Sequence, residues 1–209
     1  MGSPIFGAHS RLDSDTLTVS PGSATGFPKE NLFDDRLFTI WKASASGTTW
    51  IKTNTGGSPA NVSYLGIASH NLFTIGATIT FEGSPDDSTW TTIFTHTPAD
   101  NKIIFRSFST VSYRYFRLSI TGGSAAVQIG ELQWGVVVDP TYGFDVGFDP
   151  NEEETNARYS ESQTGNFLGV VLSYVSRRTA VRLRLIQDSW IRDMTTSGFG
   201  DFWTTTPRK

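Results

Sequence analysis

The chain contains no cysteine and few charged residues, and each absence excludes a class of function. Without cysteine, disulfides and thiolate chemistry are excluded. Only 18% of its 209 residues are charged and the formal net charge at pH 7 is -3, so nothing favours nucleic acid or an anionic membrane as a partner. No apolar run approaches the roughly 20 residues of a membrane span. Residues 1–15 lack the basic and apolar regions of a signal peptide.

Catalytic motifs are missing as well. The sequence has no nucleophile motif, no glycine-rich phosphate loop and no zinc-ligand spacing. Its three histidines, His9, His70 and His96, are far apart in the chain. The acidic stretches at residues 84–89 and 152–154 have the compositions of a turn and of a solvated loop. We therefore predict a protein that is not an enzyme.

Aromatic residues and glycine are abundant, with 15 Phe, 6 Trp, 6 Tyr and 20 Gly, a mixture that favours strands and turns. In residues 77–83 the side chains alternate, so that Ile79 and Phe81 share one face. Similar runs predict strands at residues 16–20, 39–43, 49–53, 62–69, 77–83, 89–95, 102–109, 113–120 and 127–135. Turn residues separate them. Residues 1–135 are thus predicted to form an antiparallel β-sandwich or jelly roll.

The composition changes after Gly135, and residues 136–209 are predicted to form a separate β-rich assembly segment. Residues 136–166 show no periodicity and are predicted to be a long loop. Residues 167–175 predict a strand that is apolar on both faces, followed by an alternating strand at residues 181–185 and a short helix from about 188 to 198.

This segment has more apolar surface than two strands can bury by themselves. We predict that it packs on the sandwich, on a neighbouring subunit, or on both. Its arginines are expected to pair with the acidic residues 152–154 or with a neighbouring subunit rather than with nucleic acid. The predicted assembly interface of a homo-oligomer consists of Phe167, Val170, Leu172, Tyr174, Arg182 and Arg184.

Residues 10–135 resemble the discoidin family, which comprises the coagulation-factor type C domains and the galactose-binding-like carbohydrate modules. The motifs that carry the resemblance are LFDDRLFTIWKA, TTWIKT, VSYLGIAS, ITFEGSPDDSTWTTIFT and YRYFRLSITGGSAAVQIGELQWG, in this order and spacing. They contain an Asp shortly before Thr-x-Trp, a second Trp that opens a strand, a Ser-x-Asp-x-x-x-Trp turn and a terminal Glu-Leu strand. The resemblance implies an eight-stranded jelly roll. Together with the residues after Gly135, the predicted fold class is all-β: a discoidin-like jelly-roll sandwich with a small C-terminal β extension and one short helix.

By position, the resemblance also implies a calcium site. Asp34 and Glu131 match the family's calcium-binding Asp and terminal-strand Glu, and such oxygen ligands suit Ca²⁺. The chain departs from the family at Arg36, where a small or acidic residue is usual. The alternative is that the Arg36 guanidinium pairs with Asp34 or Glu131 in place of the ion.

Sugar binding is the other property that the resemblance implies. The candidate ligand-binding residues are His70, Asn71 and Arg106, although a lone histidine in a loop more often braces the loop by a hydrogen bond. Trp41, Trp50, Trp90 and Trp134 lie within strand motifs, so we predict that they pack in the core or at its rim rather than bind sugar.

The whole chain further resembles tailed-bacteriophage structural proteins, through NLFDDRLFTIWKA, LGIASHNL, GNFLGVVLSYVSRRTAVRLRL and FGDFW. This resemblance implies a virion protein of the tail tip or tail fibre region. Its partners would be copies of itself and other tail proteins, and its jelly roll would contact the host surface, with a host glycan as a further candidate partner. The alternative is a carbohydrate-binding module of a bacterial extracellular protein, or a non-catalytic part of a glycan-degrading enzyme.

Overall fold

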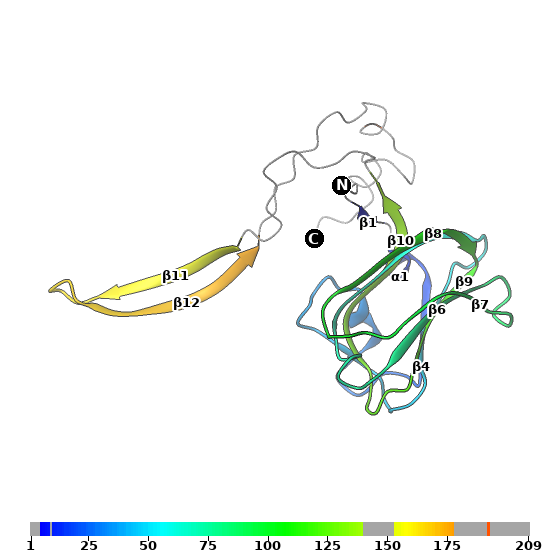
Figure 1. The fold of residues 1–209 in the computed structure, drawn as a ribbon, viewed down its shortest axis with the longest axis horizontal. Helices are drawn as coiled ribbons and strands as arrows, with labels where there is room; N and C mark the ends of the chain where they lie inside the picture. Colours follow the sequence, from blue (N-terminus) through cyan, green and yellow to red (C-terminus); the bar gives the residue numbers. More distant parts are fainter. Residues whose placement is uncertain (1–4, 9, 140–152, 178–191, 193–209) are drawn as a thin grey trace. The chain divides into compact units, whose positions relative to one another are not determined.

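The computed structural model describes residues 5–8, 10–139, 153–177 and 192 (Figure 1). Two units are considered separately: a sandwich within residues 5–139 and a hairpin within residues 153–177. The elements of the sandwich are β1 (Phe6–Ala8), α1 (Arg11–Ser14), β2 (Thr16–Ser20), η1 (Lys29–Leu32), β3 (Trp41–Lys42), β4 (Thr49–Asn54), β5 (Ala60–His70), β6 (Thr78–Ser84), β7 (Thr91–His96), β8 (Ile104–Tyr113), β9 (Tyr115–Thr121) and β10 (Gln128–Val138).

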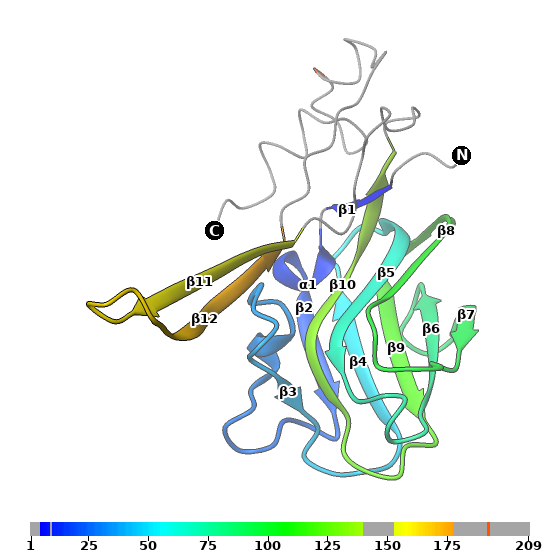
Figure 2. The same ribbon diagram turned by 60° about the vertical axis from the view of Figure 1, so that its left-hand side comes forward.

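Two five-stranded antiparallel sheets make up the sandwich (Figure 1, Figure 2). One has the order β1-β10-β5-β8, with β3 also paired to β10, and the other has the order β2-β4-β9-β6-β7. Every strand predicted between residues 16 and 135 is present, and β10 continues to Val138. The expectation of eight strands is wrong for the described residues, because the short strand β1, which was not predicted, and the two-residue strand β3 both add to the edge of β10.

The core fills the space between the two sheets. In β6, the alternation predicted from the sequence buries Ile79 and Phe81 completely. Trp41 and Trp134 are also fully buried, as predicted. Their indole N–H groups find partners: Trp41 Nε1 donates to Ser23 Oγ at 2.9 Å and Trp134 Nε1 donates to a threonine hydroxyl of β4 at 3.3 Å.

The remaining two tryptophans of the sequence prediction lie at the rim. The Lys52 ammonium lies 5.2 Å from the centroid of the Trp50 ring, and the Arg117 guanidinium lies 4.0 Å from that of Trp90. Both rings are half-buried. Each therefore covers the edge of the sandwich beneath a cation rather than standing free in a loop.

The hairpin consists of β11 (Glu153–Glu161) and β12 (Phe167–Arg177), paired antiparallel. The strand predicted at residues 167–175 is present. The prediction of a loop over residues 136–166 is wrong for Glu153–Glu161, because a strand of polar residues needs only backbone hydrogen bonds to join a ladder. The strand predicted at residues 181–185, Arg182 and Arg184 lie outside the described residues, as does the predicted helix apart from Arg192. In the described part of the chain, no helix has both the length and the apolar character to cross a membrane.

Candidate functional site

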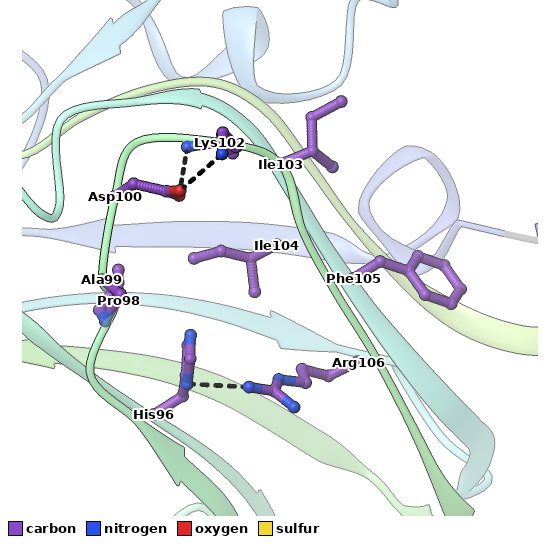
Figure 3. Close-up of a pocket in the computed structure, with 9 residues that line it drawn as sticks. All are labelled: His96, Pro98, Ala99, Asp100, Lys102, Ile103, Ile104, Phe105 and Arg106. Atoms are coloured by element: carbon purple, nitrogen blue, oxygen red, sulfur yellow. Dashed lines mark hydrogen bonds and ion pairs between the residues drawn. The ribbon is translucent and has the colours of Figure 1, made fainter. Parts of the chain in front are cut away.

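A groove of about 250 Å³ lies where the end of β7, the following loop and the start of β8 meet. β7 is the outermost strand of one sheet and β8 the outermost strand of the other, so the groove lies at one edge of the sandwich. Its lining consists of His96, Pro98, Ala99, Asp100, Lys102, Ile103, Ile104, Phe105 and Arg106 (Figure 3).

The alternation of β8 decides which side chains enter the groove. Ile104 is largely buried, and Arg106 extends toward His96 (Figure 3). Phe105 points the other way, and its ring stacks on Tyr64 with 5.6 Å between the ring centroids. The groove therefore has an aliphatic floor with an arginine and a histidine at one end.

Arg106 and His96 are joined by a hydrogen bond. Arg106 Nη2 donates to His96 Nδ1 at 3.2 Å, so the imidazole proton of the neutral ring resides on Nε2. Partial burial, together with the neighbouring Arg106 charge, holds the pKa of His96 below its ordinary value. His96 is therefore neutral at pH 7 and supplies one N–H donor in addition to those of the guanidinium.

The opposite end of the groove carries one acid and one base that are paired with each other. Asp100 Oδ1 accepts from the Lys102 backbone N–H at 3.0 Å, and Asp100 Oδ2 lies 3.2 Å from Lys102 Nζ. The backbone hydrogen bond from Lys102 lowers the pKa of Asp100. Among the ion pairs of the described residues, none includes Arg106. One uncompensated positive charge therefore remains in the groove.

His70 and Asn71 hold loops in place. His70 is only 6% exposed; its Nε2 donates to the Lys102 carbonyl at 2.8 Å and its Nδ1 accepts from the Leu72 N–H at 3.3 Å. Asn71 Nδ2 donates to the Ala126 carbonyl, and its Oδ1 accepts a backbone N–H of β10. Of the three ligand-binding candidates from the sequence, only Arg106 lines the groove, while His70 supports the groove loop from behind.

His96 is the groove residue that the sequence interpretation missed. It lies ten residues before Arg106, on a strand that pairs with β6 and not with β8. The loop at residues 97–103 joins β7 directly to β8, and the stacking of the two sheets turns Arg106 toward His96. A histidine directly after the strand predicted at residues 89–95 was the one available signal, and it does not identify its partner.

Acidification is expected to destabilise the sandwich through His70. Burial lowers the pKa of His70 below its ordinary value of 6.5, so below that pH the unfolded chain takes up a proton that the folded chain excludes. Stability contributed by the neutral imidazole is complete above pH 6.5 and is lost as the pH falls through the lowered pKa. Protonation would also abolish the acceptor that Leu72 uses.

The measurement is the urea midpoint between pH 7.5 and 5 for the wild type and for His70→Gln, which stays neutral and keeps a donor for the Lys102 carbonyl. The wild type should lose more stability on acidification than the variant. Equal slopes would show that His70 does not contribute to the acid sensitivity. The comparison separates His70 from other groups that titrate in this range.

A second candidate site lies in the loop between η1 and β3. Asp34 Oδ1 accepts from the Arg36 backbone N–H at 3.0 Å, and Asp34 Oδ2 accepts from the Thr39 hydroxyl at 2.7 Å. The same hydroxyl lies 3.0 Å from the Arg36 carbonyl oxygen. Ser69 Oγ donates to the Leu37 carbonyl and ties this loop to the end of β5. The loop thus gathers oxygen atoms around Asp34.

Glu131 faces this loop from β10. Its Oε1 accepts from Gln133 Nε2 at 3.1 Å, whereas Oε2 is buried and has no hydrogen-bond partner among the described residues. Burial, together with the neighbouring charges of Asp35 and Asp34, raises the pKa of Glu131 to about 7. The structure therefore brings Asp34 and Glu131 together and leaves a buried carboxylate oxygen that lacks a positive partner.

These groups fit a calcium ion: the Asp34 and Glu131 carboxylates, the Thr39 hydroxyl and the Arg36 carbonyl are hard oxygen donors. Among the described residues there is no metal-binding group of three or more His, Asp or Glu side chains, so the site depends on neutral oxygens for the rest. No ion pair of the described residues involves the Arg36 side chain. Calcium stays a prediction here, as does the Arg36 alternative.

No protein-family model and no curated protein matches the sequence. Solved structures do match the sandwich. Chitosan-binding module 1, derived from a chitosanase/glucanase of Paenibacillus sp. IK-5, is 25% identical with a TM-score of 0.52, and the match covers 61% of this chain and 99% of the module. A selenomethionine-labelled variant of that module is 26% identical with a TM-score of 0.51, covering 61% and 98%.

A more distant match is CpGH89CBM32-5 from Clostridium perfringens, solved with GalNAc-β-1,3-galactose. It is 13% identical with a TM-score of 0.50 and covers 59% of this chain and 96% of that one, which shows the fold alone. The chain has a discoidin-like β-sandwich fold. The predicted all-β fold class is thereby confirmed, and the sandwich is similar to carbohydrate-binding modules. None of these three structures concerns a phage tail.

Proposed function

We propose that this chain is a non-catalytic carbohydrate-binding module that holds a glycan in the groove beside Arg106. The observation that carries the proposal is the likeness to a chitosan-binding module over 99% of that module's length. This favours the alternative from the sequence, a module of an extracellular protein, over the virion protein, which stays a prediction that no comparison supports. The same proposal places the protein outside the cell, where polysaccharides are encountered.

The chemistry of the groove supports glycan binding. Arg106 and His96 offer N–H donors, Asp100 offers an acceptor, and Ile104 provides an aliphatic floor. A sugar presents hydroxyl groups beside C–H faces, and pockets with a few placed polar groups on an apolar lining bind such ligands. Asp100 is the one carboxylate among the lining residues. Glycoside hydrolysis usually needs two, so the groove is suited to binding rather than cleavage.

Affinity gel electrophoresis of the full chain with soluble polysaccharides tests the proposal. We expect at least one polysaccharide to retard the wild type, and His96→Ala to be retarded less. Asp87→Ala, on the exposed turn between β6 and β7, is the control: relative to its own mobility without polysaccharide, it should be retarded as much as the wild type. Retardation by none of a broad panel of neutral, anionic and cationic polysaccharides would rule the proposal out.

The hairpin favours a second proposed function, association with another copy of this chain. Its large apolar side chains are between 48% and 67% exposed: Phe167, Leu168, Val170, Val171, Leu172 and Tyr174. Successive side chains along β12 point to opposite faces, so these residues occupy both faces of the hairpin. The hairpin sheet has only two strands in the described residues. A two-stranded sheet is marginally stable alone, and its free edges favour strand addition.

Light scattering measures this association. The full chain is expected to have the mass of an oligomer. The Leu172→Lys substitution is expected to lower this solution mass. Val171→Lys, the preceding residue in a regular part of the ladder, places the charge on the opposite face and shows whether one face or both take part. A monomeric wild type at tens of micromolar would contradict self-association.

A further inference from the structure

The groove carries an unequal distribution of charge. At one end, the Asp100 carboxylate accepts both the backbone N–H and the ammonium of Lys102, so its charge is compensated. At the other end, Arg106 has a neutral imidazole as its hydrogen-bond partner and takes part in no ion pair among the described residues. The electrostatic complement of this end is an anion.

The donors at this end are oriented before a ligand arrives. The hydrogen bond to His96 Nδ1 uses one N–H of the Arg106 guanidinium, which has five, and leaves the others available. The imidazole retains its Nε2–H as a further donor. A planar guanidinium matches the two oxygens of a carboxylate, and restraint of the side chain by His96 reduces the entropy lost on binding. The aliphatic Ile104 lines the groove beside them and can pack against the C–H face of a sugar.

We propose that the groove is selective for anionic glycans and binds the carboxylate of a uronic acid residue at Arg106 and His96. This inference deepens the proposed function and rests on it. It also separates this chain from the chitosan-binding module that its sandwich resembles. Chitosan carries ammonium groups, which Arg106 repels, whereas a uronate carboxylate forms two parallel hydrogen bonds with a guanidinium.

Isothermal titration of the full chain tests the selectivity. The ligands are oligogalacturonate, a neutral galactose oligomer of equal length and a chitosan oligomer, all at one fixed calcium concentration because calcium binds uronates itself. We expect the tightest binding for oligogalacturonate. Arg106→Gln should weaken that binding by about ten- to a hundredfold, the effect of losing a charge-assisted hydrogen bond. Affinity for the neutral oligomer should change far less.

Arg158→Gln is the matched control, because it removes the same charge from an exposed arginine of β11. It should leave all affinities unchanged, and equal melting temperatures would show that both variants are folded. The selectivity is overturned if the neutral or the chitosan oligomer binds as tightly as oligogalacturonate or more tightly. It is also overturned if the Arg106→Gln variant binds oligogalacturonate like the wild type. Either result leaves the proposal of glycan binding intact. Failure of all three oligomers and of every panel polysaccharide overturns both proposals.

Discussion

Replacement of Phe81 by alanine is expected to lower the free energy of unfolding of the sandwich by about 3–5 kcal/mol, the usual range for a buried phenylalanine. Phe81 is fully buried, and its ring centroid lies 5.9, 5.8, 5.9 and 5.4 Å from those of Phe94, Phe108, Phe116 and Trp134. These rings come from both sheets. Removal of the ring leaves a cavity that rigid aromatic neighbours on several strands cannot close.

Denaturant titration followed by tryptophan fluorescence measures this effect. Phe73→Ala is the matched control, since it deletes the same ring from a loop where the side chain is 51% exposed. Phe73→Ala should lower the free energy of unfolding by less than about 1 kcal/mol, because little apolar surface is lost from the core. Similar losses for the two variants would show that Phe81 does not hold the two sheets together.

Calcium is expected to stabilise the sandwich, by about 2.7 kcal/mol when its concentration is a hundred times the dissociation constant. The physical reason is the buried Glu131 Oε2, which has no hydrogen-bond partner among the described residues and lies near the Asp34 and Asp35 charges. Glu131→Gln should therefore change the melting temperature in opposite directions in chelator and in calcium. In chelator above pH 7, where Glu131 is ionised, it removes a buried charge without a positive partner and raises the melting temperature, whereas in calcium it removes a ligand and abolishes the stabilisation.

Thermal unfolding in calcium and in chelator measures both effects. Asp87→Asn changes an exposed carboxylate that pairs with Lys52 and should leave the calcium response intact. The Arg36 alternative predicts the contrary pattern: chelation changes nothing, and Arg36→Gln destabilises the chain. A melting temperature that is the same in calcium and chelator for the wild type would therefore reject the calcium site.

Local patterns were sufficient to predict the strands of the sandwich other than β1. Alternation over residues 77–83 identified the buried face of β6, because the side-chain period of a strand is independent of its partners. The same reasoning failed at β11, whose residues show no apolar alternation. A hairpin exposed on both faces imposes no such alternation, so β11 is recognisable only from its hydrogen bonds with β12.

The candidate sites also differ in how far the sequence could predict them. The residues alone were enough to predict the β-sandwich and the burial of Trp41 and Trp134, since each is encoded in a local motif or in a motif order, whereas the calcium site at Asp34 and Glu131 stays a prediction. The three-dimensional structure was needed to show that Arg106 meets His96 and that His70 is turned inward to the Lys102 carbonyl. The physical reason is that the groove lies between edge strands of two different sheets. The loop at residues 97–103 keeps the two strands near each other, but which of their side chains face each other depends on how the sheets stack around the core.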